Sequence, residues 1–357
     1  MKTNEFRIEN RMVGARHPSY FIADISANHD GDLGRARELI RLAAEAGADA
    51  AKFQNFQAAS IVSDKGFRSL GGQQSHQSRW KSSVFEVYRK ASLPWEWTPI
   101  LKAECDKVGI HYFSTPYDFG AVDMLDPFVG AYKIGSGDIT WIEMIRRIGG
   151  KRKPVILATG AAEMSDVQRA VKVVRECGVP LGLMQCNTNY TGSLENFKHI
   201  HLRVLESFSI CFPDAVLGLS DHTPGHATVL GAVALGARLI EKHFTDDQSR
   251  DGPDHPFSMT PRSWRDMVDR TRELESAMGN AMKEVSDNER DTIVIQRRCL
   301  RAASDIVRGT VLEERHLVAL RPAPANSVPP WASHVLLGKR TLHDMSLHDP
   351  FYWNSVE

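Results

Sequence analysis

The chain has 357 residues, which is too many for one ordinary core and predicts a large domain accompanied by a smaller one. Lys and Arg together number 44, as do Asp and Glu, so no net charge would draw the chain to nucleic acid or to an anionic membrane. No apolar run approaches the length of about 18 residues that a transmembrane helix needs, residues 1–16 are too polar for a signal peptide, and the five scattered cysteines lack CxxC spacing, so a cytoplasmic protein is expected.

Short apolar runs alternate with amphipathic helical patterns from residue 20 to residue 243. The runs predict eight buried parallel strands, at 20–25, 50–54, 111–114, 131–134, 155–158, 181–186, 216–219 and 239–243. Helical patterns fill most of the gaps, including 33–46, 99–108, 165–177 and 227–235, and a further helix is predicted at 261–278. Eight β/α units in succession predict an α/β fold, a (β/α)8 TIM barrel within a domain at 1–280.

Three segments depart from this alternation. The connection 55–83 is long and rich in Ser, Gly, Gln and Arg, which is typical of a functional lid or of a disordered loop. Segment 281–297 is polar and charged and is interpreted as a linker. The tail 298–357 has short apolar runs and Pro-rich turns, which predict a small β-rich domain with little core of its own.

His222 and His243 lie at the ends of the last two predicted barrel strands, His222 three residues after 216–219 and His243 as the last residue of 239–243. A helix is predicted between these strands, and parallel strands joined in this way end at the same edge of the sheet, where barrel enzymes keep their active sites. Either histidine alone is typical of a hydrogen-bonded core residue. Two neutral imidazoles that converge at this edge can bind one divalent metal ion.

Other polar side chains stand at the ends of the predicted strands. Lys52, Thr115 and Lys133 lie at the ends of the second, third and fourth strands, and Ser136 follows between two glycines. Glycines let the backbone approach a ligand, and lysines are rarely buried without a partner, so these residues predict an anionic substrate in the barrel mouth. Asp24 lies in the first strand and is a candidate acid–base residue or acceptor of a sugar hydroxyl.

A set of short motifs, taken in order, resembles the sialic acid synthase family. The motifs are DISANHDGD at 24–32, KFQ at 52–54, FSTP at 113–116, KIGSGD at 133–138, SDH at 220–222, EKHF at 241–244 and GPDH at 252–255. In the tail, RAASDIVRG at 301–309, LRP at 320–322 and LGK at 337–339 resemble that family's antifreeze-like (SAF) domain, so the resemblance covers essentially the whole chain. It implies that phosphoenolpyruvate condenses with an N-acetylated sugar aldehyde of the N-acetylmannosamine type. The product would be a nine-carbon 3-deoxy-2-keto acid of the sialic acid type, formed with release of phosphate.

The resemblance also implies roles for individual residues. The implied catalytic residues are Asp24, Lys52, Lys133 and Asp138. Lys52, Thr115, Lys133, Ser136 and Ser220 match the phosphoenolpyruvate cradle, and Gln54, Asp138, Tyr190 and Asp254 match the sugar side. His222 and His243 match the ligands of a divalent metal, for which Mn²⁺ is expected and Mg²⁺ or Co²⁺ are alternatives. Arg321 matches an arginine that reaches into the partner's barrel in a domain-exchanged homodimer.

The chain departs from the family pattern at three strand ends. The usual glutamate of the first strand is Asp24 here, a hydroxyl residue of the fifth strand is Ala158, and Tyr190 is followed by Thr191 where proline is usual. These departures leave the sugar open, so a pseudaminic, legionaminic or other nonulosonic acid synthase is an alternative. A non-catalytic sugar-binding relative in polysaccharide assembly is an alternative of another class.

Overall fold

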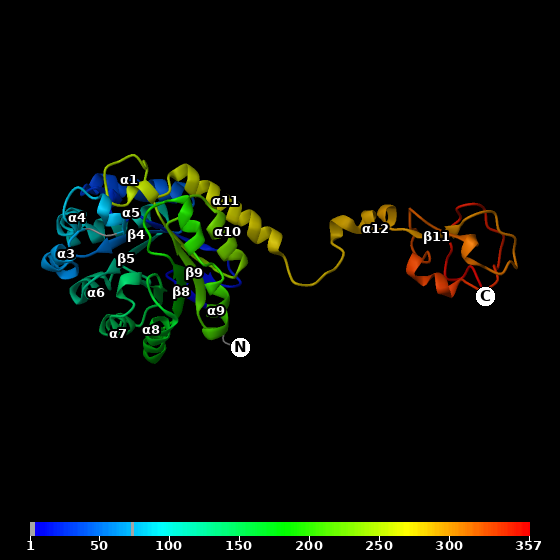
Figure 1. Ribbon diagram of the computed structural model, residues 1–357, viewed down its shortest axis with the longest axis horizontal. Helices are drawn as coiled ribbons and strands as arrows, with labels where there is room; N and C mark the ends of the chain where they lie inside the picture. The colour runs from blue at the N-terminus through cyan, green and yellow to red at the C-terminus, as the bar shows by residue number, and fades with distance from the viewer. Residues whose placement is uncertain (1–3, 73–74) are drawn as a thin grey trace. The chain divides into compact units, whose positions relative to one another are not determined.

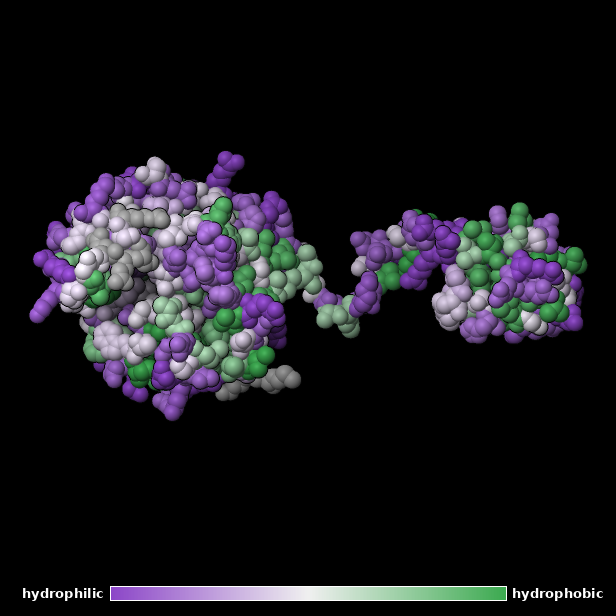
Figure 2. Space-filling model, in the orientation of Figure 1, coloured by the Kyte–Doolittle hydropathy of each residue, from purple (hydrophilic) through white to green (hydrophobic). Residues whose placement is uncertain are grey.

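The computed structural model describes residues 4–72 and 75–357. The chain divides into two compact units, Met1–Gly279 and Asn280–Glu357, and each is described by itself. Hydrophilic and hydrophobic residues are interspersed over the visible surface of both units (Figure 2). Among the described residues, no helix combines the length and the apolar character that crossing a membrane requires.

The first unit is built on a parallel sheet of eight strands in the described part of the chain, with helices around its outside (Figure 1). The strands are β3 (Tyr20–Asp24), β4 (Ala50–Asn55), β5 (His111–Pro116), β6 (Tyr132–Ile134), β7 (Val155–Ala158), β8 (Leu181–Cys186), β9 (Val216–Asp221) and β10 (Leu239–His243). Their order is β5-β4-β3-β10-β9-β8-β7-β6, so the last strand pairs with the first, as in a barrel. The predicted TIM barrel is confirmed, and every predicted strand is present.

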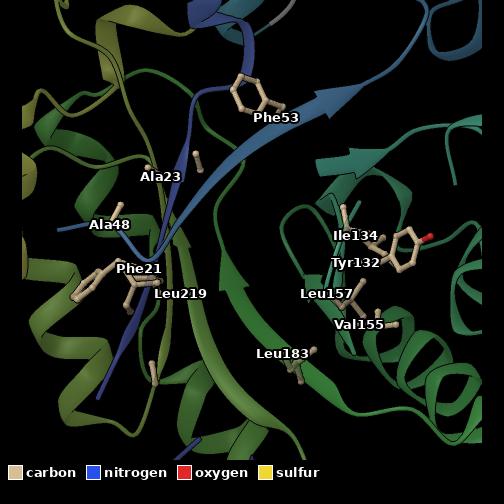
Figure 3. Close-up of a cluster of buried hydrophobic side chains, with 14 of the residues drawn as sticks. Phe21, Ala23, Ala48, Phe53, Tyr132, Ile134, Val155, Leu157, Leu183 and Leu219 are labelled. Carbon is tan, nitrogen blue, oxygen red and sulfur yellow. The ribbon is translucent and has the colours of Figure 1, made fainter. Parts of the chain in front are cut away.

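Helices follow the strands and cover the outer face of the sheet. They are α1 (Leu33–Glu45), α5 (Thr98–Val108), α6 (Phe119–Leu125), α7 (Ile142–Gly149), α8 (Met164–Cys177), α9 (Val204–Cys211), α10 (Ala227–Ala234) and α11 (Pro261–Met278). Helix α4 (Val84–Ala91) lies at the mouth instead, where Val87, Tyr88 and Ala91 line a cavity. Buried strand side chains such as Phe21, Phe53, Leu157, Leu183 and Leu219 belong to the large cluster that the helices complete (Figure 3).

Side chains alternate along each strand, so the neighbours of these outward residues point into the barrel. A second cluster fills the interior near the strand starts, where Tyr20, Ala50, Ala131, Val216 and Leu239 are all buried. Each polar residue at a strand end that shares this inward register therefore lies above a packed core, at the carboxyl-terminal mouth.

A hairpin that the sequence interpretation missed covers the other end of the barrel. Strands β1 (Glu5–Ile8) and β2 (Arg11–Gly14) pair antiparallel, and Phe6, Ile8 and Val13 join the interior cluster. The hairpin closes the amino-terminal end, so the open end of the barrel is the one where the candidate residues lie.

The long connection after β4 contains short helical segments. They are α2 (Ala58–Ile61), α3 (Asp64–Ser69) and the 3-10 turn η2 (Ser75–Arg79), while residues 73–74 of the predicted lid or disordered loop lie outside the described residues. The first part of this connection packs against the barrel unit, since Phe56, Ala58 and Val62 are buried, whereas α3 has no buried residue.

The second unit contains the antiparallel pair β11 (Cys299–Ala302) and β12 (Leu317–Leu320). Its small core includes Leu300, Leu312, Val328, Leu336 and Phe351. The segment 281–297, interpreted as a linker, contains the 3-10 turn η7 (Asp287–Glu289) and helix α12 (Arg290–Gln296), so it is not uniformly irregular. Short 3-10 segments at Glu314–His316 and Pro330–Val335 complete the unit.

Candidate functional site

Two buried lysines and two buried carboxylates form the floor of the mouth. The Nζ atom of Lys52 lies 2.6 Å from Asp24 Oδ2, and that of Lys133 lies 3.4 Å from Glu241 Oε1. Lys52 also approaches Glu241 Oε1 at 3.8 Å, and all four side chains are at most 6% exposed. Burial alone would lower the pKa of Lys52, but the charges of Asp24 and Glu241 outweigh it and raise that pKa. Lys52 therefore stays cationic in a nearly dry site.

Several buried polar atoms around this floor have no hydrogen-bond partner within the described residues. They are Asp24 Oδ1, Thr115 Oγ1, Asp138 Oδ2, Glu241 Oε2 and His243 Nδ1. Buried polar atoms in folded proteins are almost always satisfied by protein or by a bound molecule. Their concentration at the mouth marks a place prepared for a polar ligand.

The ends of β6 and β7 approach closely beside Lys133. Ser136 Oγ accepts a hydrogen bond from the backbone N–H of Gly160 at 2.9 Å, and a Cβ atom on Gly160 would lie 2.5 Å from a methyl group of Thr188. Glycine is therefore required here. The hydroxyl of Thr159 donates to the carbonyl of Met184, so it does not replace the hydroxyl that is missing at Ala158.

His222 and His243 lie side by side across the rim, with ring centroids 5.3 Å apart. Two imidazoles that share one ion through bonds of about 2.1 Å would have centroids about 5 Å apart, so this separation fits a shared metal. His222 Nδ1 donates to the carbonyl of Asn187 at 2.9 Å, which leaves Nε2 with its lone pair free, and burial followed by the effect of His243 lowers the pKa of His222 to about 3. The lowered pKa keeps His222 neutral, as metal ligation requires, although the hydrogen bond to Asn187 acts in the opposite direction.

No group of three or more His, Cys, Asp or Glu side chains in the described part of the chain is arranged to hold a metal ion. The two histidines could therefore supply only part of a coordination sphere. A site of this kind leaves positions for water and substrate, as catalytic metal sites do. The residues fit a labile catalytic ion better than a structural one.

The sugar-side residues meet next to His243. Asp254 Oδ2 accepts a 2.6 Å hydrogen bond from Ser26 Oγ and lies 3.8 Å from His243 Nδ1. Asp254, Gln54 and Tyr190 line a cavity of about 140 Å³, called here the inner chamber. The ring of Tyr190 lies 4.2 Å from that of His222, centroid to centroid. The structure thus brings Asp24, Lys52, Lys133, His222 and His243 into one group at the mouth, with Gln54, Tyr190 and Asp254 beside it.

A model of the NeuB family matches residues 39–283, which is more than half of the chain. The chain belongs to the NeuB family. Among its relatives, N,N'-diacetyllegionaminic acid synthase of Campylobacter jejuni is 34% identical over 89% of this chain and 94% of its own length. Pseudaminic acid synthase of the same organism is 34% identical over 92% of this chain and 94% of its own. Among solved structures, N-acetylneuraminic acid synthetase of Leptospira borgpetersenii superposes with a TM-score of 0.71 at 27% identity, covering 82% of this chain and 95% of that one.

These findings confirm the predicted resemblance and the assignment of the chain as an enzyme of a synthase family. The roles of the individual site residues and the metal stay predictions. The predicted SAF domain and domain-exchanged homodimer also stay predictions. Arg321 is exposed in the second unit, directly after β12, and its contact with a sugar is likewise a prediction.

Glu241 is the site residue of this NeuB-family chain to which the sequence analysis gave no role. It lies on β10 two residues before His243, so both side chains share the inward register. Its carboxylate accepts from Ser220 Oγ at 3.3 Å and stands between the two lysines. Its position could have indicated a role from the sequence, because it is a charged residue inside an apolar run, two positions before a candidate metal ligand.

Ionisation of Asp138 lowers the folding stability of this NeuB-family enzyme in a pH-dependent way. Burial raises the pKa of Asp138 from 3.8 to about 6. A carboxyl group with a raised pKa binds its proton more tightly when folded, so stability falls as the pH rises from about 4 to about 6, and the loss is complete above that range.

Asp138→Asn should therefore stabilise the barrel at pH 7.5 by about 1–3 kcal/mol, and by much less at pH 4.5. Thermal unfolding of both proteins at the two pH values measures the difference. The exposed Asp251, replaced by Asn, serves as the control and should change little at either pH. If the stabilisation by Asp138→Asn is no larger at pH 7.5 than at pH 4.5, ionisation of Asp138 does not lower the stability of the fold.

Proposed function

We propose that this chain condenses phosphoenolpyruvate with an acylated amino sugar in its open, aldehyde form. The product would be a nine-carbon 3-deoxy-2-keto acid, formed with release of phosphate. One observation carries the proposal: two buried lysines converge below a pair of histidines at the open end of the barrel. An anion would lie over the lysines, and the group that reacts with it would lie toward the histidines.

The lysine floor suits phosphoenolpyruvate, which carries a carboxylate and a phosphate. Lys52 and Lys133 would bind these groups together with the hydroxyls of Thr115, Ser136 and Ser220, and Thr115 Oγ1 has no partner among the described residues. Glu241 and Asp24 pair with the two lysines. Hydrogen bonds that involve charged groups are the stronger ones, so the floor would hold the anion in a fixed orientation.

The sugar would enter by the inner chamber. Asp254 would accept a hydrogen bond from a sugar hydroxyl, and the Gln54 amide can donate and accept, because both line this chamber. His222 and His243 would hold a divalent cation, for which we propose Mn²⁺, and when bound this ion would supply Lewis-acid polarisation of the sugar carbonyl.

The reaction needs one new carbon–carbon bond and one broken carbon–oxygen bond. C3 of phosphoenolpyruvate attacks the aldehyde carbon, water adds at C2, and the C2–O bond to phosphate breaks. Phosphoenolpyruvate, aldehyde and water thereby become the keto acid and inorganic phosphate. Lys52 and Lys133 would stabilise the negative charge that persists on the phosphate and carboxylate, and Asp24 would handle a proton through its unpaired oxygen.

The acceptor would set which nonulosonic acid is made, and the candidate products include sialic, legionaminic and pseudaminic acids. Relatives that make the last two are equally similar to this chain, at 34% identity each. We propose a nonulosonic acid synthase in this wider sense, with N-acetylmannosamine as the simplest acceptor to try. The retained lysines and histidines favour it over a non-catalytic sugar-binding relative.

Lys133→Ala should lower kcat/KM for phosphoenolpyruvate by about 30- to 4,000-fold. The range corresponds to about 2–5 kcal/mol, the usual cost of truncating one partner of a buried charge pair. Steady-state phosphate release measures it, with the exposed Lys172 on α8, replaced by Ala, as the control. Unchanged kcat/KM for phosphoenolpyruvate would remove Lys133 from the proposed cradle.

A further inference from the structure

The inner chamber is walled by aromatic side chains that the proposed reaction does not use. Phe56, Trp80 and Tyr88 come from the connection after β4 and from α4, and Tyr117 follows β5. The chamber adjoins a larger cavity of about 830 Å³, called here the vestibule, and Trp80 and Tyr190 line both. A sugar on its way to His243 would pass along this wall.

Contacts between the rings fix the wall in place. Phe56 meets Tyr88 at 5.3 Å and Tyr117 at 5.8 Å between centroids, and Trp80 lies 6.4 Å from Tyr88. Phe56 is 4% exposed, so it is held by packing on its far side. Aromatic pairs at these separations attract each other, and a wall built from them keeps its shape when a ligand enters.

The charges around the chamber oppose a second anion. Among the described residues that line it there is no lysine or arginine, and Asp254 adds a carboxylate. The cations Lys81, Lys90 and Arg250 line the vestibule instead and are exposed to solvent. Arg250 is already paired with Asp30, at 2.8 Å. A phosphate that entered the chamber would lose its hydration and would contact only aromatic rings and a carboxylate there. Burying an anion without a cationic partner costs free energy.

We propose that the acceptor is an uncharged acylated amino sugar with apolar substituents, and that Phe56, Trp80 and Tyr88 select it. This inference rests on the proposed function and narrows its substrate class. The aromatic faces pack against acyl methyl groups and against a methyl group at the sugar's far end. A hydroxymethyl group there gains less from the rings, and a phosphate is rejected.

Three acceptors that differ only at C6 test the selection: N-acetylmannosamine, its 6-deoxy analogue and its 6-phosphate. The metal-loaded full-length protein should use the 6-deoxy sugar about 10-fold better than the parent, measured as kcat/KM, because a methyl group suits an apolar pocket. It should use the 6-phosphate about 100-fold less well than the parent, because no lysine or arginine is among the described residues that line the chamber. Equal or better use of the 6-phosphate would overturn the proposal.

Two variants connect the selection to the wall. Tyr88→Ala should erase most of the preference for the 6-deoxy sugar while the KM for phosphoenolpyruvate stays the same. Val87 lines both cavities, and the variant Val87→Lys should raise kcat/KM for the 6-phosphate at least about 10-fold. Phe119→Ala removes a half-exposed ring on α6 outside both cavities and should leave the three ratios unchanged.

Calorimetric binding of the same three sugars separates this proposal from the proposed function. If no sugar supports turnover, the proposed function fails, while the order of the three affinities still decides the selection. If turnover occurs and the 6-phosphate is preferred, only the selection fails.

Discussion

Replacing Lys242 with methionine should lower the free energy of unfolding by about 3–5 kcal/mol, the cost of breaking a buried ion pair by removing one partner. Lys242 pairs with Asp221 where the two side chains are 1% and 0% exposed. Asp221 also accepts hydrogen bonds from the hydroxyls of Thr223 and Thr228, at 2.7 and 2.8 Å. The substitution would leave a desolvated carboxylate with only uncharged partners, which are these two hydroxyls and the backbone N–H of Thr223 at 3.3 Å.

The pair holds together the part of the barrel that carries the histidines. Asp221 ends β9 directly before His222, and Lys242 precedes His243 at the end of β10. Both charged side chains point outward from the barrel, opposite to Ser220 and Glu241. The loss of stability should therefore occur without removal of any group that faces the substrate.

Urea unfolding of the full chain measures this loss. Lys172→Met, on the exposed face of α8, is the matched control and should stay within about 0.5 kcal/mol of the wild type. Adding Asp221→Asn to Lys242→Met should restore part of the stability, because the double variant buries no unpaired charge. A Lys242→Met protein that loses less than about 1 kcal/mol would show that water or a rearrangement compensates the carboxylate.

Removal of divalent metal should lower turnover by at least about 1,000-fold, since a Lewis-acid ion contributes several kcal/mol to the stabilisation of developing charge. The 5.3 Å separation of the His222 and His243 rings and the free Nε2 of His222 are the basis of this expectation. Mn²⁺ added after chelation should restore the rate.

His222→Ala should bind Mn²⁺ weakly in electron paramagnetic resonance titrations and should not recover activity with added Mn²⁺. His226 lies four residues further on, pairs with Asp266 at 3.0 Å, and provides the control, because His226→Ala should keep both properties. Full activity after exhaustive chelation, with elemental analysis showing no metal, would contradict the proposed cofactor.

The strands were predictable because each is buried on both faces and reads as an apolar run between polar breaks. Differences arise mainly at the ends: β5 and β9 each extend two residues further than predicted, to Pro116 and Asp221. There polar side chains replace apolar ones, so hydrophobicity no longer marks the strand. The same transition placed Lys52, Lys133 and His243 at the mouth, since parallel strands end together.

The features that escaped prediction depend on contacts between distant segments. The hairpin of β1 and β2 has four residues per strand in a polar stretch, and its role follows from packing against Tyr20 and Leu239. The aromatic wall brings Phe56, from the connection after β4, against Tyr88 on α4, so no local pattern indicates that their rings meet. Glu241 looked like an ordinary charged residue until the register placed it between two lysines.

Mass spectrometry of the product made from phosphoenolpyruvate and an acylated amino sugar tests the proposed condensation most directly. With the metal-loaded protein, we expect a new acid whose mass equals that of the sugar plus pyruvic acid, formed together with one phosphate per molecule. Free pyruvate with unchanged sugar would indicate simple hydrolysis of phosphoenolpyruvate. That result, or the absence of any new acid across the sugars tested, would contradict the proposed function.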